Sequence, residues 1–403
     1  YGIPSFKLQK DVIEAEVEII RLMGAEFRYG VEVGRDVTLD ELREQGFKAF
    51  YVAIGCQGGR LAGIPGEDAE DVTVAVDFLR EVNSGKIDTL SGRTIVVGGG
   101  NVAIDVARNA CRLGSEHVEM FCLESEAQMP ASEEERREAV EDGAHISCGW
   151  GPKEIHLDEA GRVCGITFKR CTRVFDDEGR FAPEYDENDL RRVDADRVVM
   201  SIGQSIVWGD LLAGSKVELG RGQGALADPQ TYQTAEPDIF VGGDVYTGPS
   251  FAIDAIAAGH EAAVSIHRFV QPGSTLTIGR NQRRYTALDR DDVVLESYDN
   301  ASREVAHVDR EREKAAPFSE YVETFTEEQV RVETARCLGC GASIVDPNKC
   351  IGCGLCTTKC AFDAIHLDRD RPECSTMVKY EQKLPSLGKY ALKRAIKIKF
   401  GRK

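Results

Sequence analysis

Long apolar stretches are missing from this 403-residue sequence, which has no run of 18 or more apolar residues and no signal peptide. A helix needs such a run to cross a lipid bilayer. Positive charge is also scarce, because 50 Lys and Arg face 68 Asp and Glu, for a net charge of −18. This charge opposes nucleic acid or an anionic membrane as a general partner. We therefore predict a soluble cytoplasmic protein with no membrane span and no nucleic-acid partner.

Cysteine is plentiful but unevenly placed. Seven of the 13 cysteines fall between positions 337 and 374, and the other six are scattered singly. Clustered thiols in a cytosolic chain indicate metal or cluster ligands rather than disulfides. The six that we expect to be core or surface thiols are Cys56, Cys111, Cys122, Cys148, Cys164 and Cys171.

Four of the clustered thiols have the spacing C-x2-C-x2-C-x3-C, which is the run of bacterial iron–sulfur ferredoxins. They are Cys350, Cys353, Cys356 and Cys360. Three thiols at this spacing can hold three corners of a 4Fe-4S cubane and send the fourth to a neighbouring cluster, whereas all four cannot easily surround one zinc ion. A zinc-bearing structural module is the minority interpretation.

The same two-cluster rule assigns Cys360 to a second cluster, with Cys337 and Cys340 as companions. Each of the two sets then lacks a fourth ligand, and only Cys374 remains in the region. Residue 361 is Ala, where the usual run has Pro. The count therefore supports one 4Fe-4S cluster and leaves the ligand set of a second incomplete.

A glycine-rich turn follows the apolar strand predicted at residues 94–97. The residues that match the pattern G-x-G-x-x-[GA] are Gly98, Gly99, Gly100, Asn101, Val102 and Ala103. In dinucleotide-binding proteins this turn joins a strand to a helix, whose free N–H groups bind the pyrophosphate. A helical pattern follows to about residue 113, and a second strand is predicted at residues 118–123. We interpret the turn as NAD(P)-binding, with a structural glycine turn as the alternative.

Glu124 stands at the end of that second strand. A carboxylate in this place accepts hydrogen bonds from the adenosine ribose hydroxyls and repels a 2′-phosphate. It therefore favours NADH over NADPH. The alternative is a solvated charge at a strand end.

Two predicted strands, at residues 49–55 and 197–203, have a similar sequence: both are apolar and end in Ile-Gly, the second at Gly203. Buried strands of this kind are typical of parallel α/β sheets. The pair would bracket an inserted domain. Within that insertion, the charged stretch at residues 176–192 is interpreted as a surface hairpin with a solvated face.

A further strand ends in Gly243 and Asp244, and Pro249 and Ser250 precede a helix of small residues. A carboxylate at the strand end can bind a sugar-alcohol hydroxyl, and the helix points its positive end at the same ligand. A flavin ring, whose N1–C2=O edge becomes anionic on reduction, suits this place. The plain alternative is an aspartate that caps the next turn.

Taken in order, these motifs resemble the glutamate synthase small-subunit family of FAD- and NAD(P)H-binding oxidoreductases. The stretches that carry the resemblance, all between residues 1 and 272, are 2–8 (GIPSFKL), 53–55 (AIG), 98–105 (GGGNVAID), 129–131 (MPA), 201–204 (SIGQ) and 242–244 (GGD). The C-terminal ferredoxin is similar to those appended in a subset of the family. The resemblance implies a nicotinamide domain inserted into an FAD domain, with Asp244 and the helix after Pro249 contacting FAD.

The sequence departs from that family's pattern in two places. The family's first FAD motif would precede Tyr1, so we expect a fragment of a longer protein whose retention of FAD stays open. NADPH-using members carry an Arg-Arg pair where this sequence has Leu123 and Glu124, which again favours NADH. A neighbouring class is excluded, because thioredoxin-reductase-like flavoproteins need a C-x-x-C dithiol and none occurs between residues 60 and 272.

The predicted fold is α/β, with two nested Rossmann-like domains that bind FAD and NAD(P), plus a small α+β ferredoxin-like domain. The expected segments are 1–60 and 205–272 (incomplete FAD domain), 61–204 (NAD(P)H domain), 273–335 (linker), 336–374 (iron–sulfur domain) and 375–403 (basic tail). The predicted function is electron transfer from NADH, or less favourably NADPH, through FAD to 4Fe-4S clusters. From there the electrons pass to a protein acceptor or a larger redox-enzyme subunit.

The alternative function is an electron-transfer or docking subunit without dehydrogenase turnover of its own. We assign no catalytic acid, base or nucleophile, because in such enzymes the cofactors carry the chemistry and the protein orients them.

Overall fold

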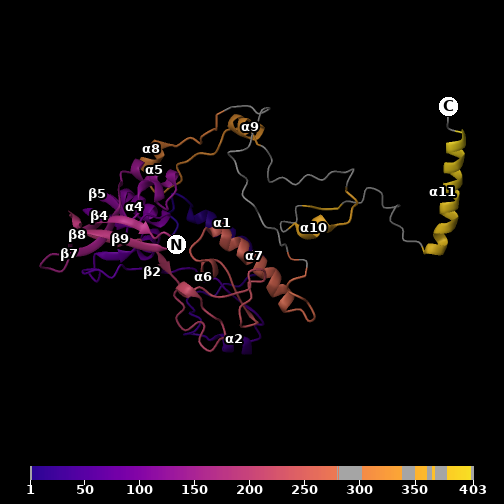
Figure 1. The fold of residues 1–403 in the computed structure, drawn as a ribbon, viewed down its shortest axis with the longest axis horizontal. Helices are drawn as coiled ribbons and strands as arrows, with labels where there is room; N and C mark the ends of the chain where they lie inside the picture. Colours follow the sequence, from indigo (N-terminus) through magenta and orange to yellow (C-terminus); the bar gives the residue numbers. More distant parts are fainter. Residues whose placement is uncertain are drawn as a thin grey trace. The chain divides into compact units, whose positions relative to one another are not determined.

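The computed structural model describes residues 2–278, 280, 302–337, 350–360, 365–367 and 379–400. The described residues up to 277 and those from 302 to 337 belong to one compact unit, and residues 278, 280 and 350 onward belong to a second (Figure 1). Among the described helices, none is both long enough and apolar enough to cross a membrane.

A five-stranded parallel sheet forms the centre of the first unit. Its strands, in spatial order, are β3 (Val72–Val74), β10 (Arg197–Met200), β4 (Arg93–Val97), β5 (His117–Cys122) and β6 (His145–Cys148). The central strand β4 and its neighbour β10 are covered on both faces, as their near-continuous apolar runs predict. Ile95, Val96 and Val198, for example, have no exposed surface.

Helices cover one face of this sheet (Figure 1). They are α3 (Ala75–Asn83), α4 (Asn101–Arg112) and α5 (Glu133–Glu141). Small residues bring α4 close to the strands, since Ala103, Ala107 and Ala110 are fully buried there. Their packing with Phe78 of α3 forms the largest apolar cluster of the described residues.

A second, antiparallel sheet covers the other face. It consists of β7 (Trp150–Leu157), β8 (Val163–Phe175) and β9 (Phe181–Val193) in that order. The two sheets meet where the rings of Phe121 and Phe168 stack with centroids 3.9 Å apart. Aromatic stacking of this kind adds to the free energy of burying the rings. The hairpin expected at residues 176–192 is therefore the outer edge of a sheet that packs on the core.

The five-stranded sheet is inserted into a smaller parallel layer. That layer pairs β1 (Phe50–Val52) with β12 (Ile239–Val241), so residues 189 positions apart lie side by side. The chain enters and leaves the insertion through an antiparallel pair, β2 (Gly58–Gly59) and β11 (Gln204–Ser205). The chain outside the insertion also contains α1 (Lys10–Leu22), α2 (Leu39–Glu44), α6 (Asp244–Thr247), α7 (Ala252–Phe269) and a 3₁₀ turn at Arg221–Gln223. Another 3₁₀ turn, at Glu126–Gln128, lies within the insertion.

Motif residues from the start of the chain attach to the inserted domain. Lys7 forms ion pairs with Asp105 of α4 (2.6 Å) and with Glu135 of α5. Burial raises the pKa of the Asp105 carboxyl to about 6, although the Lys7 ammonium acts in the opposite direction. The GIPSFKL and GGGNVAID stretches are thus joined by a largely buried pair.

Residues 302–335, which we expected to lie in a linker, also contact the inserted domain. They contain α8 (Arg310–Ala315) and α9 (Glu327–Ala335). Arg108 of α4 is almost fully buried and donates to Asp142 (2.8 Å), to Glu138 and to the hydroxyl of Tyr321 (2.6 Å). The hydrogen bond from the Arg108 guanidinium to Tyr321 therefore attaches this part of the expected linker to α4.

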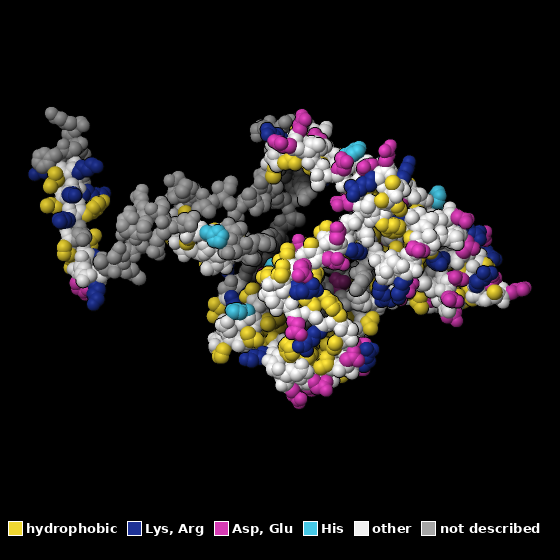
Figure 2. All heavy atoms as spheres, turned by 180° about the vertical axis from the view of Figure 1, so that it is seen from behind, with side chains coloured by type: hydrophobic (Ala, Val, Ile, Leu, Met, Phe, Trp, Pro, Cys, Tyr) yellow, Lys and Arg dark blue, Asp and Glu magenta, His cyan; other side chains and the backbone are white. Residues whose placement is uncertain are grey.

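The second unit contains two described helices, α10 (Leu355–Lys359) and α11 (Tyr380–Phe400). α11 has Pro385 inside it and carries Lys393, Lys397 and exposed Leu392 and Ile396. Figure 2 shows basic and hydrophobic side chains together along this helix. The basic tail expected at residues 375–403 is therefore helical over most of its length.

The buried cation yields a stability prediction. Arg108→Ala should lower the free energy of unfolding by about 3 kcal/mol, because it leaves buried acceptors without their donor. Urea denaturation of both proteins measures the difference. The matched control is Arg137→Ala, since Arg137 is exposed and its carboxylate neighbours are 3.8 and 3.9 Å away. We expect the control to lose less than about 1 kcal/mol, and equal losses would contradict the role of Arg108.

Candidate functional site

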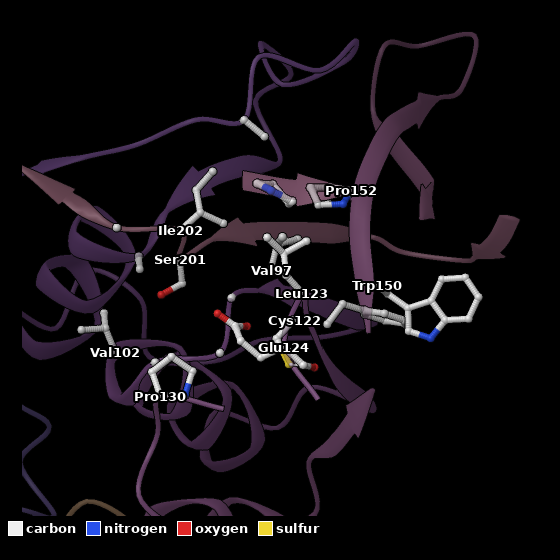
Figure 3. A pocket seen from close by; sticks show the side chains of 18 of the residues that line it. Val97, Val102, Cys122, Leu123, Glu124, Pro130, Trp150, Pro152, Ser201 and Ile202 are labelled. Carbon is white, nitrogen blue, oxygen red and sulfur yellow. Dashed lines mark hydrogen bonds between the residues drawn. The ribbon is translucent and has the colours of Figure 1, made fainter. Parts of the chain in front are cut away.

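A cavity of about 670 Å³ lies at the carboxyl ends of β4, β5 and β10. Its lining comes from the glycine turn after β4, from the strand ends and from the antiparallel sheet (Figure 3). Open α/β sheets bind their ligands outside the carboxyl ends of the strands. The position of this cavity is therefore that of a ligand site.

The glycine turn is shaped by its neighbours. Gly98 has φ 146°, and a Cβ there would overlap the carbonyl oxygen of Ser201. A Cβ at Gly99 would lie 2.9 Å from the Cβ of Cys122. A Cβ at Gly100, in contrast, would have no described atom within 4 Å. The first two glycines are needed by the fold, whereas the third leaves space that a ligand can use.

The N-terminus of α4 adjoins that space. Gly100 is its N-cap residue and offers no side chain to cap the helix, and Asn101 and Val102 of the first turn line the cavity. The first N–H groups of a helix have no partner within the helix and carry its positive dipole end. The turn can therefore hold an anion such as a pyrophosphate.

Glu124 lies beside the glycine turn. One of its carboxylate oxygens is 3.0 Å from the place that a Gly99 Cβ would take, and its carbonyl accepts a hydrogen bond from the amide of Gly149 (3.0 Å). In Figure 3 its side chain lies between Pro130 and Leu123, and the ring of Trp150 points away from it. A partly exposed carboxylate here suits ribose hydroxyls as hydrogen-bond donors.

The antiparallel sheet supplies a wall that the sequence interpretation missed. The residues that it contributes to the lining are Trp150, Pro152, Lys169, Phe181, Pro183 and Tyr185. Lys169 is held by Glu187 (2.8 Å), and its ammonium lies 4.1 Å from the centre of the Tyr185 ring. β9 has no fully buried residue, in agreement with the solvated face expected at residues 176–192, but part of the strand also lines the cavity, which was not expected. The period-2 spacing of Phe181, Pro183 and Tyr185 was the available signal.

A second cavity, of about 270 Å³, lies at the ends of β1 and β12. Gly243 there has φ 65°, and Asp244 accepts a hydrogen bond from the amide of Ser250 (3.2 Å). All three residues line this cavity, close to the N-terminus of α7. The carboxylate and helix end fit the hydroxyl groups and anionic edge that a flavin nucleotide would present.

A comparison with protein families decides the assignment. The model of the pyridine nucleotide-disulphide oxidoreductase family matches residues 4–259. The chain belongs to this family. The match covers more than half of the chain and contains every residue that lines the larger cavity and all but Ile3 of those that line the smaller one.

Individual relatives within the family agree with the resemblance found from the motifs. The glutamate synthase [NADPH] small chain of Escherichia coli (strain K12) is 33% identical over 290 residues, which are 67% of this chain and 60% of that protein. The NADP(+)-dependent formate dehydrogenase subunit beta of Moorella thermoacetica is 33% identical over 358 residues, 84% of this chain and 48% of that protein. The predicted resemblance is confirmed, and the chain spans about half the length of the curated relatives it matches.

A solved structure with the same fold is that of Mycobacterium tuberculosis FprA in complex with NADPH. Its TM-score is 0.54 at 20% identity, and the match covers 66% of this chain and 73% of that one. This likeness confirms the predicted arrangement of nested Rossmann-like domains.

The cysteine-rich region matches a 4Fe-4S binding domain over residues 343–366. Its thiols are soft ligands of the type that iron–sulfur clusters use. Gly352 and Gly354 have positive φ values that let the chain turn between the cysteines. Cys350 and Cys353 are exposed. Within the described residues, however, no three His, Cys, Asp or Glu side chains are gathered as metal ligands. The assignment of single cysteines to clusters therefore stays a prediction.

The other predicted site residues fall into clear groups. Those that line the larger cavity are Gly98, Gly99, Gly100, Asn101, Val102, Glu124, Gly203 and Pro249. Ala103 is fully buried beneath the turn, where its small side chain lets α4 pack on the sheet. Cys337, Cys356 and Cys360 are described but do not form a ligand set, whereas Cys340 and Cys374 lie outside the described residues.

The open position in the turn yields a binding prediction. Gly100→Ala should leave the stability of the protein unchanged, because its φ of −89° suits alanine and no described atom is near. It should weaken binding of a nicotinamide nucleotide by roughly tenfold or more, because the methyl group takes the place of the pyrophosphate. Isothermal titration calorimetry measures the affinity. Gly388→Ala, in α11, is the control, and an unchanged affinity for Gly100→Ala would remove the turn from the binding site.

Proposed function

We propose that this chain is an NAD(P)H-dependent oxidoreductase that passes electrons through FAD to iron–sulfur centres and on to a protein partner. The observation that carries the proposal is the open position at Gly100, next to an uncapped helix N-terminus and the Glu124 carboxylate. These are the groups that a dinucleotide needs for its pyrophosphate and ribose. The family match supports the same class of substrate.

The relation between the two cavities supports hydride transfer. Pro249 lines the larger cavity and Ser250, the next residue, lines the smaller one. A nucleotide that extends from the glycine turn past Gly203 to Pro249 would bring its reactive end to the boundary of the two cavities. The chain would thereby orient the hydride donor toward the flavin site, and no side chain need act as acid or base.

The smaller cavity is the proposed FAD site. Asp244 would accept hydrogen bonds from sugar-alcohol hydroxyls, and the α7 N-terminus would favour the anionic edge of the ring. FAD supplies the chemistry of accepting a hydride and releasing electrons singly. Gly242 also lines this cavity, and only glycine fits there, since a Cβ would overlap the hydroxyl of Tyr51.

NADH is the proposed preferred donor. Among the described residues no cation forms an ion pair with Glu124, and the nearby Lys169 is paired with Glu187. A 2′-phosphate would therefore meet an unneutralised carboxylate. The relatives carry both cofactors in their names, since one is an NADP(+)-dependent formate dehydrogenase subunit and another, 31% identical over 271 residues, is the NAD-dependent dihydropyrimidine dehydrogenase subunit PreT of Escherichia coli (strain K12).

A protein partner is proposed because several relatives are named as subunits or chains of larger enzymes. Exposed apolar side chains on α1 and α7, among them Leu22 and Ile253, offer a contact surface.

The thiols of the iron–sulfur domain, with Cys350, Cys353 and Cys356 sharing one cluster, would pass the electrons to this partner. Reduced thiols of this kind favour the cytoplasm as the compartment.

The alternative, an electron-transfer or docking subunit without its own turnover, predicts a different result in one experiment. Full-length protein is purified anaerobically, its flavin and iron are quantified, and it is mixed with NADH or NADPH. The proposal expects the flavin absorption band to bleach, and more rapidly with NADH. A flavin-containing protein that neither nucleotide bleaches would favour the alternative.

The choice of cofactor has its own test. Glu124→Arg replaces a repelling carboxylate by a cation that can pair with a 2′-phosphate, so the ratio of kcat/KM for NADPH to that for NADH should rise by roughly tenfold or more. Glu126→Arg, at a residue that does not line the cavity, is the control. Unchanged relative kinetics in Glu124→Arg would remove this residue from cofactor selection.

A further inference from the structure

Two cysteines face each other at the edge of the nucleotide cavity. The register of β5 and β6 pairs Cys122 with Cys148, and their sulfur atoms are 3.7 Å apart. Neighbouring strands are about 4.8 Å apart, which lies within the range of Cα spacings that disulfides span. The two thiols can therefore be joined without unfolding either strand.

Cys122 also belongs to the wall of the cavity. It lines the space beside Glu124, and its Cβ lies 2.9 Å from the position of a Gly99 Cβ. Its thiol is 3.7 Å from the carbonyl of Glu124, toward which it donates. A change at this sulfur thus reaches both the glycine turn and the proposed ribose-binding residue.

We propose that Cys122 and Cys148 form a redox-active dithiol, and that its oxidation to a disulfide weakens nucleotide binding at the glycine turn. This inference rests on the proposed function, because it concerns the same site. It assigns a role to two of the scattered thiols that the sequence pattern identified only as core or surface cysteines.

The chemistry needs an oxidant of the peroxide class. Cys148 is partly exposed, whereas Cys122 is buried and burial raises the pKa of its thiol. The peroxide therefore oxidises Cys148 first, converting its thiol to a sulfenic acid with release of one water. The Cys122 sulfur then attacks the sulfenic sulfur, forms the S–S bond and releases a second water. Two thiols and one hydrogen peroxide thus give one disulfide and two waters.

The new bond changes the geometry of the cavity wall. A disulfide has an S–S length of about 2.05 Å, so the sulfur atoms must approach by about 1.7 Å from their 3.7 Å separation. The Cys122 thiol also loses the hydrogen that it directs at the Glu124 carbonyl. Because packed interiors transmit such shifts, the turn at Gly99 should move with Cys122.

The test uses full-length, anaerobically prepared protein and NAD⁺ as the probe. Reduced and peroxide-treated samples are compared by peptide mass mapping and by isothermal titration calorimetry. We expect a linked Cys122–Cys148 peptide and an NAD⁺ affinity that is lower by roughly fivefold or more and is restored by dithiothreitol. By reciprocity, saturating NAD⁺ should oppose formation of the disulfide.

Two variants separate this pair from the other thiols. Cys148→Ser should keep its NAD⁺ affinity after peroxide treatment, whereas Cys164→Ser, which changes a thiol on β8, should respond as the unmodified protein does. Absence of the linked peptide, or equal affinities of the reduced and oxidised proteins, would overturn the inference alone. Reduced protein that fails to bind NAD⁺ would overturn the proposed function as well, so the two failures are distinguishable.

Discussion

The close approach of the backbone after β4 to its two neighbouring strands is the constraint on which the site depends. A side chain at Gly98 would overlap the carbonyl at the end of β10, and one at Gly99 would press on Cys122 at the end of β5. The turn is therefore fixed against both flanking strands. Only Gly100 faces open space, and the first turn of α4 follows it directly. The geometry of the proposed anion site is thus a consequence of packing rather than of any charged side chain.

The nesting of the domains brings this turn near the second cavity. Residues 61–204 leave and re-enter the β1–β12 layer through the β2–β11 pair, so both layers share one compact unit. Pro249 and Ser250 then contribute to different cavities although they are adjacent in sequence. The ion pair of Lys7 with Asp105 attaches the start of the chain to α4, and the hydrogen bond from Arg108 to the Tyr321 hydroxyl attaches residues 302–337 to the same helix. Such contacts resist separation of the parts that the proposed electron transfer must keep together.

Local patterns were enough to predict the strand–turn–helix at residues 94–113 and the carboxylate that follows it, because each feature is encoded within about thirty residues. The cavity wall on β9 was not predicted, since Phe181 and Tyr185 stand in a stretch rich in charged residues and only the pairing of β9 with β8 places them beside the cavity. The contact of Tyr321 with Arg108 joins residues 213 positions apart, and no local pattern encodes such a distance. The facing of Cys122 and Cys148 likewise required the strand register.

The most direct measurement of the central claim is a crystal structure of the full-length protein with NADH bound. The account predicts that the pyrophosphate lies against the backbone of Gly99 and Gly100 at the N-terminus of α4, with the adenosine ribose hydrogen-bonded to Glu124. The nicotinamide ring should then lie near Pro249. A pyrophosphate bound elsewhere, or a ribose turned away from Glu124, would contradict the account.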